Sequence, residues 1–171
     1  ITTTGYSTVD FNTWPELSKT VLMILMFIGS CAGSTAGGFK ISRVILLLKM
    51  VKRHINGLIH PRAVGVVHFE GKKVDEPVLK GVTSYLTIYL VCFIAVFMLL
   101  SFDGFDIVTN FTAASACFNN IGPGFGAVGP AASYADYSVF SKLVLSAAML
   151  FGRLEIYPML FVFSRYAWSK R

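Results

Sequence analysis

Charged residues are scarce in this chain of 171 residues: they make up 14% of the sequence, whereas 54% of the residues are hydrophobic. A soluble domain of this size usually carries about 25% charged residues. The shortage of charge therefore disfavours an ordinary soluble enzyme and predicts a chain that lies in a lipid bilayer.

Residues that carry catalysis or bind metals are also few. The three cysteines are an odd number in apolar surroundings, which predicts neither a disulfide framework nor a zinc site. The three histidines all lie between residues 54 and 68, and the motifs Gly-x-Ser-x-Gly and His-Glu-x-x-His are absent. An intramembrane enzyme needs a nucleophile, a base or metal ligands at membrane depth, so we predict no enzymatic activity.

The basic residues are concentrated in two segments. The chain has 15 Lys and Arg against nine Asp and Glu; nine of the basic residues lie in 40–80 and three more in 165–171. Such clusters between apolar spans indicate the cytoplasmic side of an inner membrane, so the acidic segments 1–20 and 103–138 are expected outside. Nucleic-acid binding would need a soluble basic face, and we expect the lipid bilayer as the partner instead.

The first apolar run, 17–28, is too short to cross a bilayer and is followed by ten glycine-rich residues, 29–38. A second helical run, 41–51, comes next. Non-helical backbone is tolerated at membrane depth only where protein covers it or where it lines a water-filled cavity. We therefore predict a broken membrane helix whose interruption faces a cavity.

The remaining segments predict a second unit of helices. Residues 54–80 are polar and basic, which indicates a cytoplasmic loop with a short hairpin around 64–74. The uncharged segment 81–102 is long enough to span a hydrocarbon core of about 30 Å, whereas 107–118 predicts a half-helix that re-enters the membrane or is buried. The last apolar run, 139–168, is expected to break near Gly152.

Two short segments superpose and predict an internal repeat. They are Thr3-Thr4-Gly5-Tyr6-Ser7 and Asn120-Ile121-Gly122-Pro123-Gly124. Each segment is followed by a polar connection and by a long helix with a break near its middle. This architecture is typical of a cation pore, in which the carbonyl oxygens of an extended loop replace the hydration shell of K⁺. The alternative is that the two central glycines only terminate helices.

Four motifs in this order resemble the membrane subunits of bacterial Trk/Ktr potassium-uptake systems, of the TrkH/TrkG type. The motifs are Thr-Thr-Gly-Tyr-Ser-Thr, Gly-Ser-x-x-Gly-Ser-Thr-x-Gly-Gly-x-Lys, Asn-Asn-Ile-Gly-Pro-Gly and Gly-Arg-Leu-Glu-Ile-Tyr-Pro. The resemblance implies an all-α membrane protein with four repeats of helix, half-helix, pore loop and helix around a central ion path.

The same resemblance implies that the chain is the C-terminal part of such a subunit. Residues 1–53 would hold the filter loop and broken inner helix of the third repeat. Residues 54–80 would form the cytoplasmic basic loop, and residues 81–171 would form the whole fourth repeat. The other pore repeats, in the same or another chain, would complete the wall of the pore.

The resemblance also assigns site residues. The filter would comprise Thr3, Thr4, Gly5, Tyr6, Asn120, Ile121, Gly122, Pro123 and Gly124, with K⁺ bound by the carbonyls of Thr4, Gly5, Ile121 and Gly122. The gate would comprise Gly29, Gly33, Ser34, Thr35, Ala36, Gly37, Gly38 and Arg153. The filter departs from Thr-Val-Gly-Tyr-Gly, so fewer well-formed carbonyl sites are expected. A Cβ added at Gly122 is expected to clash or to turn the carbonyls away.

Other interpretations of these residues stay open. Gly29, Gly33 and Gly37 have the spacing of a helix-packing motif, whereas a phosphate-binding loop is excluded because Phe39 stands where that motif needs Lys. Arg153 either faces the pore beside the glycine-rich segment and favours closure, or only ties backbone carbonyls together.

Two features of the outer half have simpler interpretations. The glycosylation sequon 110–112 lies on the expected half-helix, so we expect it to be unused. Tyr134 and Tyr137 are expected at the outer membrane interface, where aromatic side chains gather.

The function implied by the resemblance is gated K⁺ uptake across the bacterial inner membrane by a multi-pass protein without an organic cofactor. The implied partners are a second copy of the subunit and a cytoplasmic, TrkA-like nucleotide-binding regulatory subunit. A Na⁺- or H⁺-coupled secondary transporter remains the alternative, because such transporters also use discontinuous helices.

Overall fold

The computed structural model describes residues 2–31, 33–34, 37–60 and 65–153, and most of them are helical. The α-helices are α1 (Glu16–Ile28), α2 (Ile41–Ile59), α3 (Glu76–Leu100), α4 (Ile107–Phe118) and α5 (Val139–Arg153). The shorter elements are four 3-10 helices and a two-stranded hairpin: η1 (Phe11–Thr13), β1 (His68–Phe69), β2 (Lys72–Lys73), η2 (Ser101–Asp103), η3 (Gly126–Val128) and η4 (Tyr134–Asp136).

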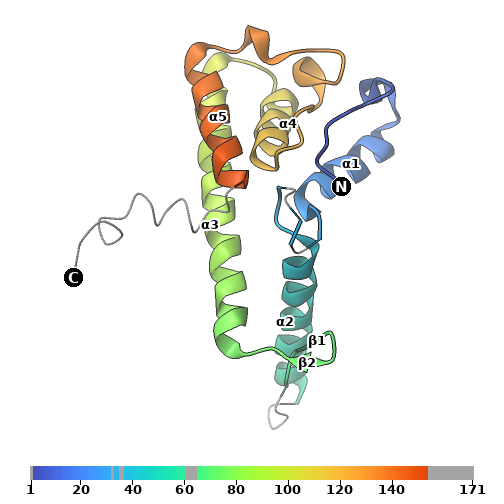
Figure 1. Ribbon diagram of the computed structural model, residues 1–171, viewed down its shortest axis with the longest axis vertical. Helices are drawn as coiled ribbons and strands as arrows, with labels where there is room; N and C mark the ends of the chain where they lie inside the picture. Colours follow the sequence, from blue (N-terminus) through green and yellow to red (C-terminus); the bar gives the residue numbers. More distant parts are fainter. Residues whose placement is uncertain (1, 32, 35–36, 61–64, 154–171) are drawn as a thin grey trace, which may run out of the picture.

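Helix α3 runs along the long axis of the molecule, with α4 and α5 beside its upper half and α2 beside its lower half (Figure 1). Within the described part of the chain, only the segment Glu76–Asp103 is both long enough and apolar enough to cross a membrane. The expected span 81–102 is therefore confirmed, and α3 extends it by one turn toward the hairpin.

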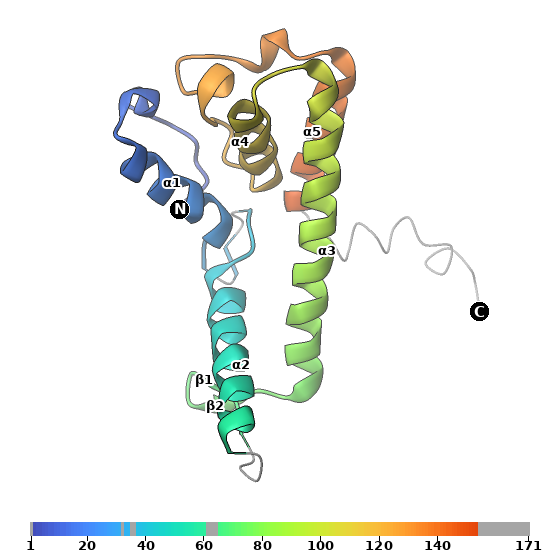
Figure 2. The ribbon, with the colours of Figure 1, turned by 180° about the vertical axis from the view of Figure 1, so that it is seen from behind.

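The predicted break between the first two helices is present. Helix α1 ends at Ile28 and α2 begins at Ile41, and the two follow one another along the side of the molecule opposite α5 (Figure 2). Gly29, Gly33 and Gly38 have φ of 70°, 83° and 89°, which no α-helix accommodates. Gly29 and Gly33 are therefore not part of a helix, which contradicts the helix-packing interpretation of Gly29, Gly33 and Gly37.

The end of α2 differs from the prediction: the helix continues past residue 51 to Ile59. Its last turns are fixed against the hairpin region, because Lys49 Nζ donates to the His68 carbonyl at 2.6 Å and Arg53 pairs with Glu76 at 2.5 Å. The predicted hairpin is confirmed, with His68 opposite Lys73. The loop between helices is consequently shorter than 54–80.

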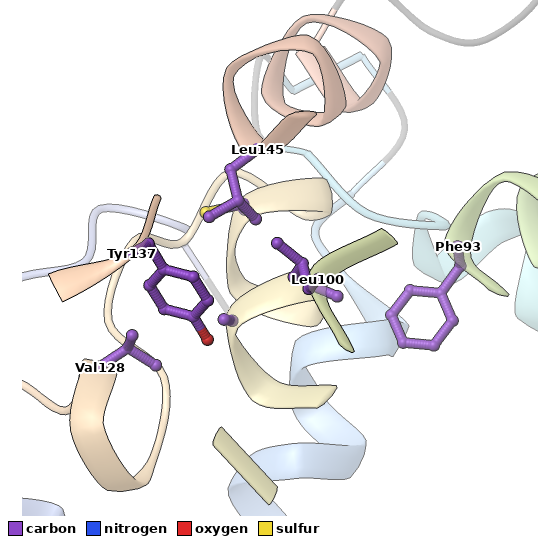
Figure 3. Close-up of a cluster of buried hydrophobic side chains, with 8 residues drawn as sticks. Phe93, Leu100, Val128, Tyr137 and Leu145 are labelled. Atoms are coloured by element: carbon purple, nitrogen blue, oxygen red, sulfur yellow. The ribbon is translucent and has the colours of Figure 1, made fainter. Parts of the chain in front are cut away.

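Helix α4 lies at the centre of the upper half and is almost completely buried. A hydrophobic cluster surrounds it, built from α3, α5 and the loop before α5. Figure 3 shows five of its members: Phe93, Leu100, Val128, Tyr137 and Leu145. Small residues on α4, among them Ala113 and Ala116 with 0% exposure, let the neighbouring helices approach closely. The half-helix predicted at 107–118 is thus confirmed as a short helix that protein covers.

Candidate functional site

The two predicted filter loops share one unusual backbone conformation. In the first loop φ is 54° at Thr3 and 78° at Gly5, with a residue of negative φ between them. In the second loop φ is 56° at Asn120 and 101° at Gly122, again with a residue of negative φ between them. Alternation of the sign of φ turns successive carbonyl oxygens toward one side of the chain, whereas a uniform strand turns them to opposite sides.

The positive φ of Thr3 shows that the alternation of φ sign is not a consequence of glycine alone. A β-branched residue with positive φ is an outlier, and such strain costs about 1–3 kcal/mol and persists only where the surroundings require it. Asn120 tolerates the same conformation more easily. The matching φ signs therefore indicate a shared structural demand on the two loops.

The two loops also touch. A Cβ added to Gly5 would overlap the carbonyl oxygen of Ile121 and lie 3.3 Å from the Pro123 ring. Glycine at this position lets the backbones of the two loops approach one another. The structure thus brings together the two segments that the sequence pattern superposed.

Helix α4 holds the second loop. The amides of Ile121 and Gly122 both donate to the Ala116 carbonyl, at 2.8 and 3.3 Å. Further along, Phe125 N–H donates to Thr112 Oγ1 at 3.0 Å, so a buried hydroxyl of α4 fixes the outer end of the loop. The C-terminal end of α4, which carries a partial negative charge favourable to cations, leads directly into this loop.

The Gly122 carbonyl oxygen, one of the predicted K⁺ ligands, accepts a hydrogen bond from the Tyr134 hydroxyl at 2.6 Å. Burial beside Cys117 raises the pKa of Tyr134 above its usual range, so the hydroxyl stays protonated and remains a donor. A cavity of about 350 Å³ lies at this point, lined by Gly5, Tyr6, Pro123 and Tyr134 among others.

Asn12 links the outer segments that follow the two loops. Its Oδ1 accepts from the Gly126 amide at 3.1 Å, and its Nδ2 reaches the Gly126 carbonyl at 3.5 Å. Phe11 packs edge-on against Phe125, with ring centroids 5.2 Å apart. Residues far apart in sequence thereby hold the two loops in register.

Two glycines, one from the glycine-rich segment and one from α5, lie against the end of α4. A Cβ at Gly37 would overlap the Asn119 carbonyl, and a Cβ at Gly152 on α5 would overlap the Phe118 carbonyl. Only glycine permits so close an approach of backbone to backbone. Gly37 of the glycine-rich segment therefore packs directly against the start of the second predicted filter loop.

Asn119 lies between α3 and the glycine-rich segment, with 0% exposure. Its Oδ1 accepts from the Tyr89 hydroxyl at 2.7 Å, while its Nδ2 has no hydrogen-bond partner among the described residues. Phe39, at the end of the glycine-rich segment, packs against Tyr85 and Tyr89 of α3 with ring centroids 5.7 and 5.8 Å away.

The two ends of the glycine-rich segment are joined at their base. Phe39 N–H donates to the Phe27 carbonyl at 3.4 Å, and Ile41 N–H donates to the Ser30 carbonyl at 3.0 Å. These bonds connect the end of α1 to the start of α2. The described residues between these two bonds belong to neither helix, and they form a loop that leaves and returns at the junction of α1 and α2.

Comparison with known proteins decides the family. The TrkH family model, described as a cation transport protein, matches residues 1–170. The chain belongs to the TrkH family. TrkG, a Trk system potassium uptake protein of Escherichia coli K12, is 38% identical over 98% of this chain, and TrkH of Halomonas elongata is 37% identical over 99%. The crystal structure of the potassium transporter TrkH from Vibrio parahaemolyticus matches 98% of this chain at 37% identity, with a TM-score of 0.87.

The chain spans about a third of the length of these TrkH-family relatives: 34% of the E. coli TrkG, 35% of the H. elongata TrkH and 36% of the V. parahaemolyticus chain. Membership of the family confirms the resemblance that the four motifs indicated, and it implies a membrane location.

The predicted gate residues of this TrkH-family chain are only partly described. Gly29, Gly37 and Gly38 are buried, and Gly33 is exposed with nothing within 4 Å of an added Cβ. Thr35 and Ala36 lie outside the described residues. Arg153 is exposed and is the last described residue of α5, so it does not lie at the centre of a described helix. Its predicted position in the pore stays a prediction.

Two sequence-based expectations are corrected. Tyr137 is only 3% exposed and its hydroxyl donates to Asn110 Oδ1 at 2.9 Å, so Tyr137 belongs to the protein interior and not to the membrane interface, whereas Tyr134 is half-buried. The predicted clash at Gly122 is wrong for the described residues, because an added Cβ has nothing within 4 Å there; only the positive φ disfavours other residues. Asn110 is 2% exposed, which agrees with an unused sequon.

Sequence reasoning expected Tyr134 at the membrane interface and quoted Asn119 only within a motif, and it did not predict the hydrogen bonds of the side chains that hold the site together. These are Asn12, Tyr89, Thr112, Asn119 and Tyr134. Each acts on a residue of another segment, and none has a local pattern that distinguishes it. The one usable signal is that buried Asn and Tyr residues require hydrogen-bond partners.

Proposed function

We propose that this chain forms part of a gated K⁺ pore that takes up potassium across the bacterial inner membrane. The observation that carries the proposal is the shared alternation of φ sign in two loops that touch at Gly5 and Ile121. The printed names of the relatives, potassium uptake proteins of Trk systems, supply the ion.

In this proposal the carbonyl oxygens of Thr4, Gly5, Ile121 and Gly122 line the ion path, and no organic cofactor takes part. Carbonyl oxygens replace the water ligands of a dehydrating cation. The C-terminal end of α4 faces the same place and adds a favourable potential. Thr3 and Asn120 supply the left-handed backbone that aims the carbonyls, and Tyr6, Pro123 and Gly124 continue the two loops outward.

The glycine-rich segment, with Gly29, Gly33, Ser34, Thr35, Ala36, Gly37 and Gly38, would act as the gate below the filter. Its support is the direct packing of Gly37 on the carbonyl of Asn119, one residue before the filter. A loop closed at its base and rich in glycine can change conformation without moving α1 and α2. Arg153, next to Gly152 on α5, would add a positive barrier that favours the closed state.

The rest of the pore would come from segments that this chain does not contain, since the chain covers about a third of its relatives. We further propose a homodimer, and a TrkA-like nucleotide-binding subunit on the cytoplasmic side, where the basic residues of the hairpin are exposed. Cysteines introduced at Lys72 or Lys73 should resist membrane-impermeant thiol reagents in intact cells; labelling from outside would reverse this topology.

Gly122→Ala tests the filter assignment, with Gly104→Ala as the matched control. Both glycines have positive φ, 101° and 72°, and open space for a Cβ, so both substitutions place alanine at positive φ without adding a clash. In the full-length protein, expressed in cells that lack other K⁺ uptake, Gly122→Ala should lower the rate of K⁺ uptake or its selectivity over Na⁺. Gly104→Ala should leave both unchanged.

Equal behaviour of the two variants at equal expression would remove this loop from the ion path. It would also remove the basis for placing K⁺ at the carbonyls of Ile121 and Gly122.

A further inference from the structure

We propose that Tyr134 determines the ion selectivity of the filter, because its hydroxyl is the donor that fixes the Gly122 carbonyl. The hydroxyl lies 2.6 Å from that oxygen. Tyr134 lies outside the filter motifs, in η4 of the loop that leads to α5. The inference rests on the proposed function, since it takes the Gly122 carbonyl as part of the ion path.

The peptide between Gly122 and Pro123 needs such a donor. Proline has no N–H, so this peptide can be anchored by hydrogen bonds only through its carbonyl oxygen. The preceding amide of Gly122 is held by the Ala116 carbonyl at 3.3 Å. Without the Tyr134 hydroxyl, α4 would still hold the amide of Gly122, but no hydrogen bond would hold its carbonyl group.

Gly122 has no side chain that resists rotation of this carbonyl group, so the Pro123 ring is the local restriction on it. The φ of Gly122, 101°, lies where glycine has freedom on both sides, and nothing lies within 4 Å of the position that a Cβ would take. The orientation of this carbonyl therefore depends on the Tyr134 hydroxyl. A carbonyl oxygen has two lone pairs, so it can accept from Tyr134 and still contact an ion.

The ring of Tyr134 is held firmly enough to act as a fixed donor. It stacks on Tyr137, with ring centroids 6.0 Å apart and an interplanar angle of 30°. Tyr137 in turn donates to Asn110 Oδ1, and Asn110 Nδ2 donates to the Phe105 carbonyl at 3.1 Å. This chain of contacts ties the donor to α4, the helix that also holds the inner end of the filter loop.

Tyr134 also lies where an ion would approach the filter from outside. It lines the cavity of about 350 Å³ together with Gly5, Tyr6 and Pro123, which belong to both filter loops. A donor at this point can act on the outermost carbonyl without occupying the narrow part of the path. Selection between K⁺ and Na⁺ depends on how many carbonyls are presented and how rigidly they are held.

The test compares Tyr134→Phe with Tyr137→Phe in the full-length protein. Each substitution removes one buried hydroxyl and keeps the ring, but only Tyr134 donates to the filter. We expect Tyr134→Phe to lower the ratio of K⁺ to Na⁺ uptake roughly two- to tenfold, the effect of losing one hydrogen bond, while K⁺ uptake itself persists. Tyr137→Phe keeps the ring that stacks on Tyr134 and should lower the ratio much less, although Tyr137 is the more deeply buried of the two.

Thermal midpoints of the purified variants serve to compare their folding. An unchanged ratio in Tyr134→Phe would overturn the inference, and so would an equal fall in both variants, which would indicate general loosening of the loop. The failure of the proposed function gives a different result: Gly122→Ala would then behave like Gly104→Ala, whatever the two tyrosine variants do.

Discussion

The two predicted filter loops have the same backbone pattern but very different support. Residues 2–9 make no backbone–backbone hydrogen bond within the described part of the chain, and Tyr6 is 95% exposed. Residues 119–126 are held by α4, by Tyr134 and by Asn12. The alternation of φ sign at Thr3 and Gly5 therefore does not depend on hydrogen bonds of the kind that α4 supplies.

A cavity beside the first loop also shows that this loop has less support than the second. A cavity of about 490 Å³ lies between residues 2–9 and α1, bordered by Leu22, Leu25 and Met26. The second loop has α4 in the corresponding position. A half-helix packed into the first cavity would give residues 2–9 the support that α4 gives to the second loop, as the proposed fourfold repeat requires.

The largest expected effect is at the contact between the loops. Gly5→Ala combines a φ of 78° with an overlap against the Ile121 carbonyl, whereas Gly122→Ala carries only the strain of positive φ. Overpacking against backbone costs about 1–3 kcal/mol beyond that strain. We expect Gly5→Ala to reduce K⁺ uptake roughly five- to hundredfold more than Gly122→Ala at equal expression. Equal loss in the two variants would mean that the loops do not touch in the working protein.

Gly152→Ala should disturb the packing of α5 against the end of α4, the helix that holds the second loop. The added Cβ would overlap the Phe118 carbonyl at the end of α4, so Gly152→Ala should push α5 away and lower the free energy of unfolding by about 2 kcal/mol or more. Gly81→Ala on α3 is the control: an added Cβ has nothing within 4 Å there, and alanine favours a helix by about 1 kcal/mol. Chemical unfolding of both variants in detergent measures the difference.

A smaller effect is expected from Tyr89→Phe. The substitution removes the one hydrogen-bond partner that the Asn119 side chain has among the described residues, which should cost about 1–3 kcal/mol of unfolding free energy. Thr87→Ala, on the exposed side of the same helix, should cost much less. A Tyr89→Phe variant as stable as the Thr87→Ala variant would show that the buried amide finds another partner.

The smallest expected effect is at the link between the two outer segments. Asn12→Ala removes both hydrogen bonds to Gly126 and should cost about 1 kcal/mol, because the site is partly exposed. Thr13→Ala, which removes only a bond to Asp10 within the same turn, is the control. A selectivity change in Asn12→Ala without one in Thr13→Ala would show that the register of the two loops, as well as their stability, depends on this asparagine.

The sequence predicted local structure well and long-range contacts poorly. Helix α4 was expected at 107–118 and found at Ile107–Phe118, because acidic residues and glycine bracket an apolar run. The end of α2 was misplaced, since its polar last turns resemble a loop until the contacts of Lys49 and Arg53 are known. Contacts such as Asn12 with Gly126, 114 residues apart, follow from the packing of helices and leave no periodic pattern in the sequence.

The closed base of the glycine-rich segment has a consequence for how such proteins can vary. Because Phe39 bonds to Phe27 and Ile41 bonds to Ser30, the distance between α1 and α2 is set at the base and not by the residues beyond it. Residues can therefore be inserted or deleted in the segment at a small entropic cost, without altering the angle between the helices. The length of the segment can therefore vary independently of the helices, and if the segment is the proposed gate, its length alone would adjust how readily the path opens.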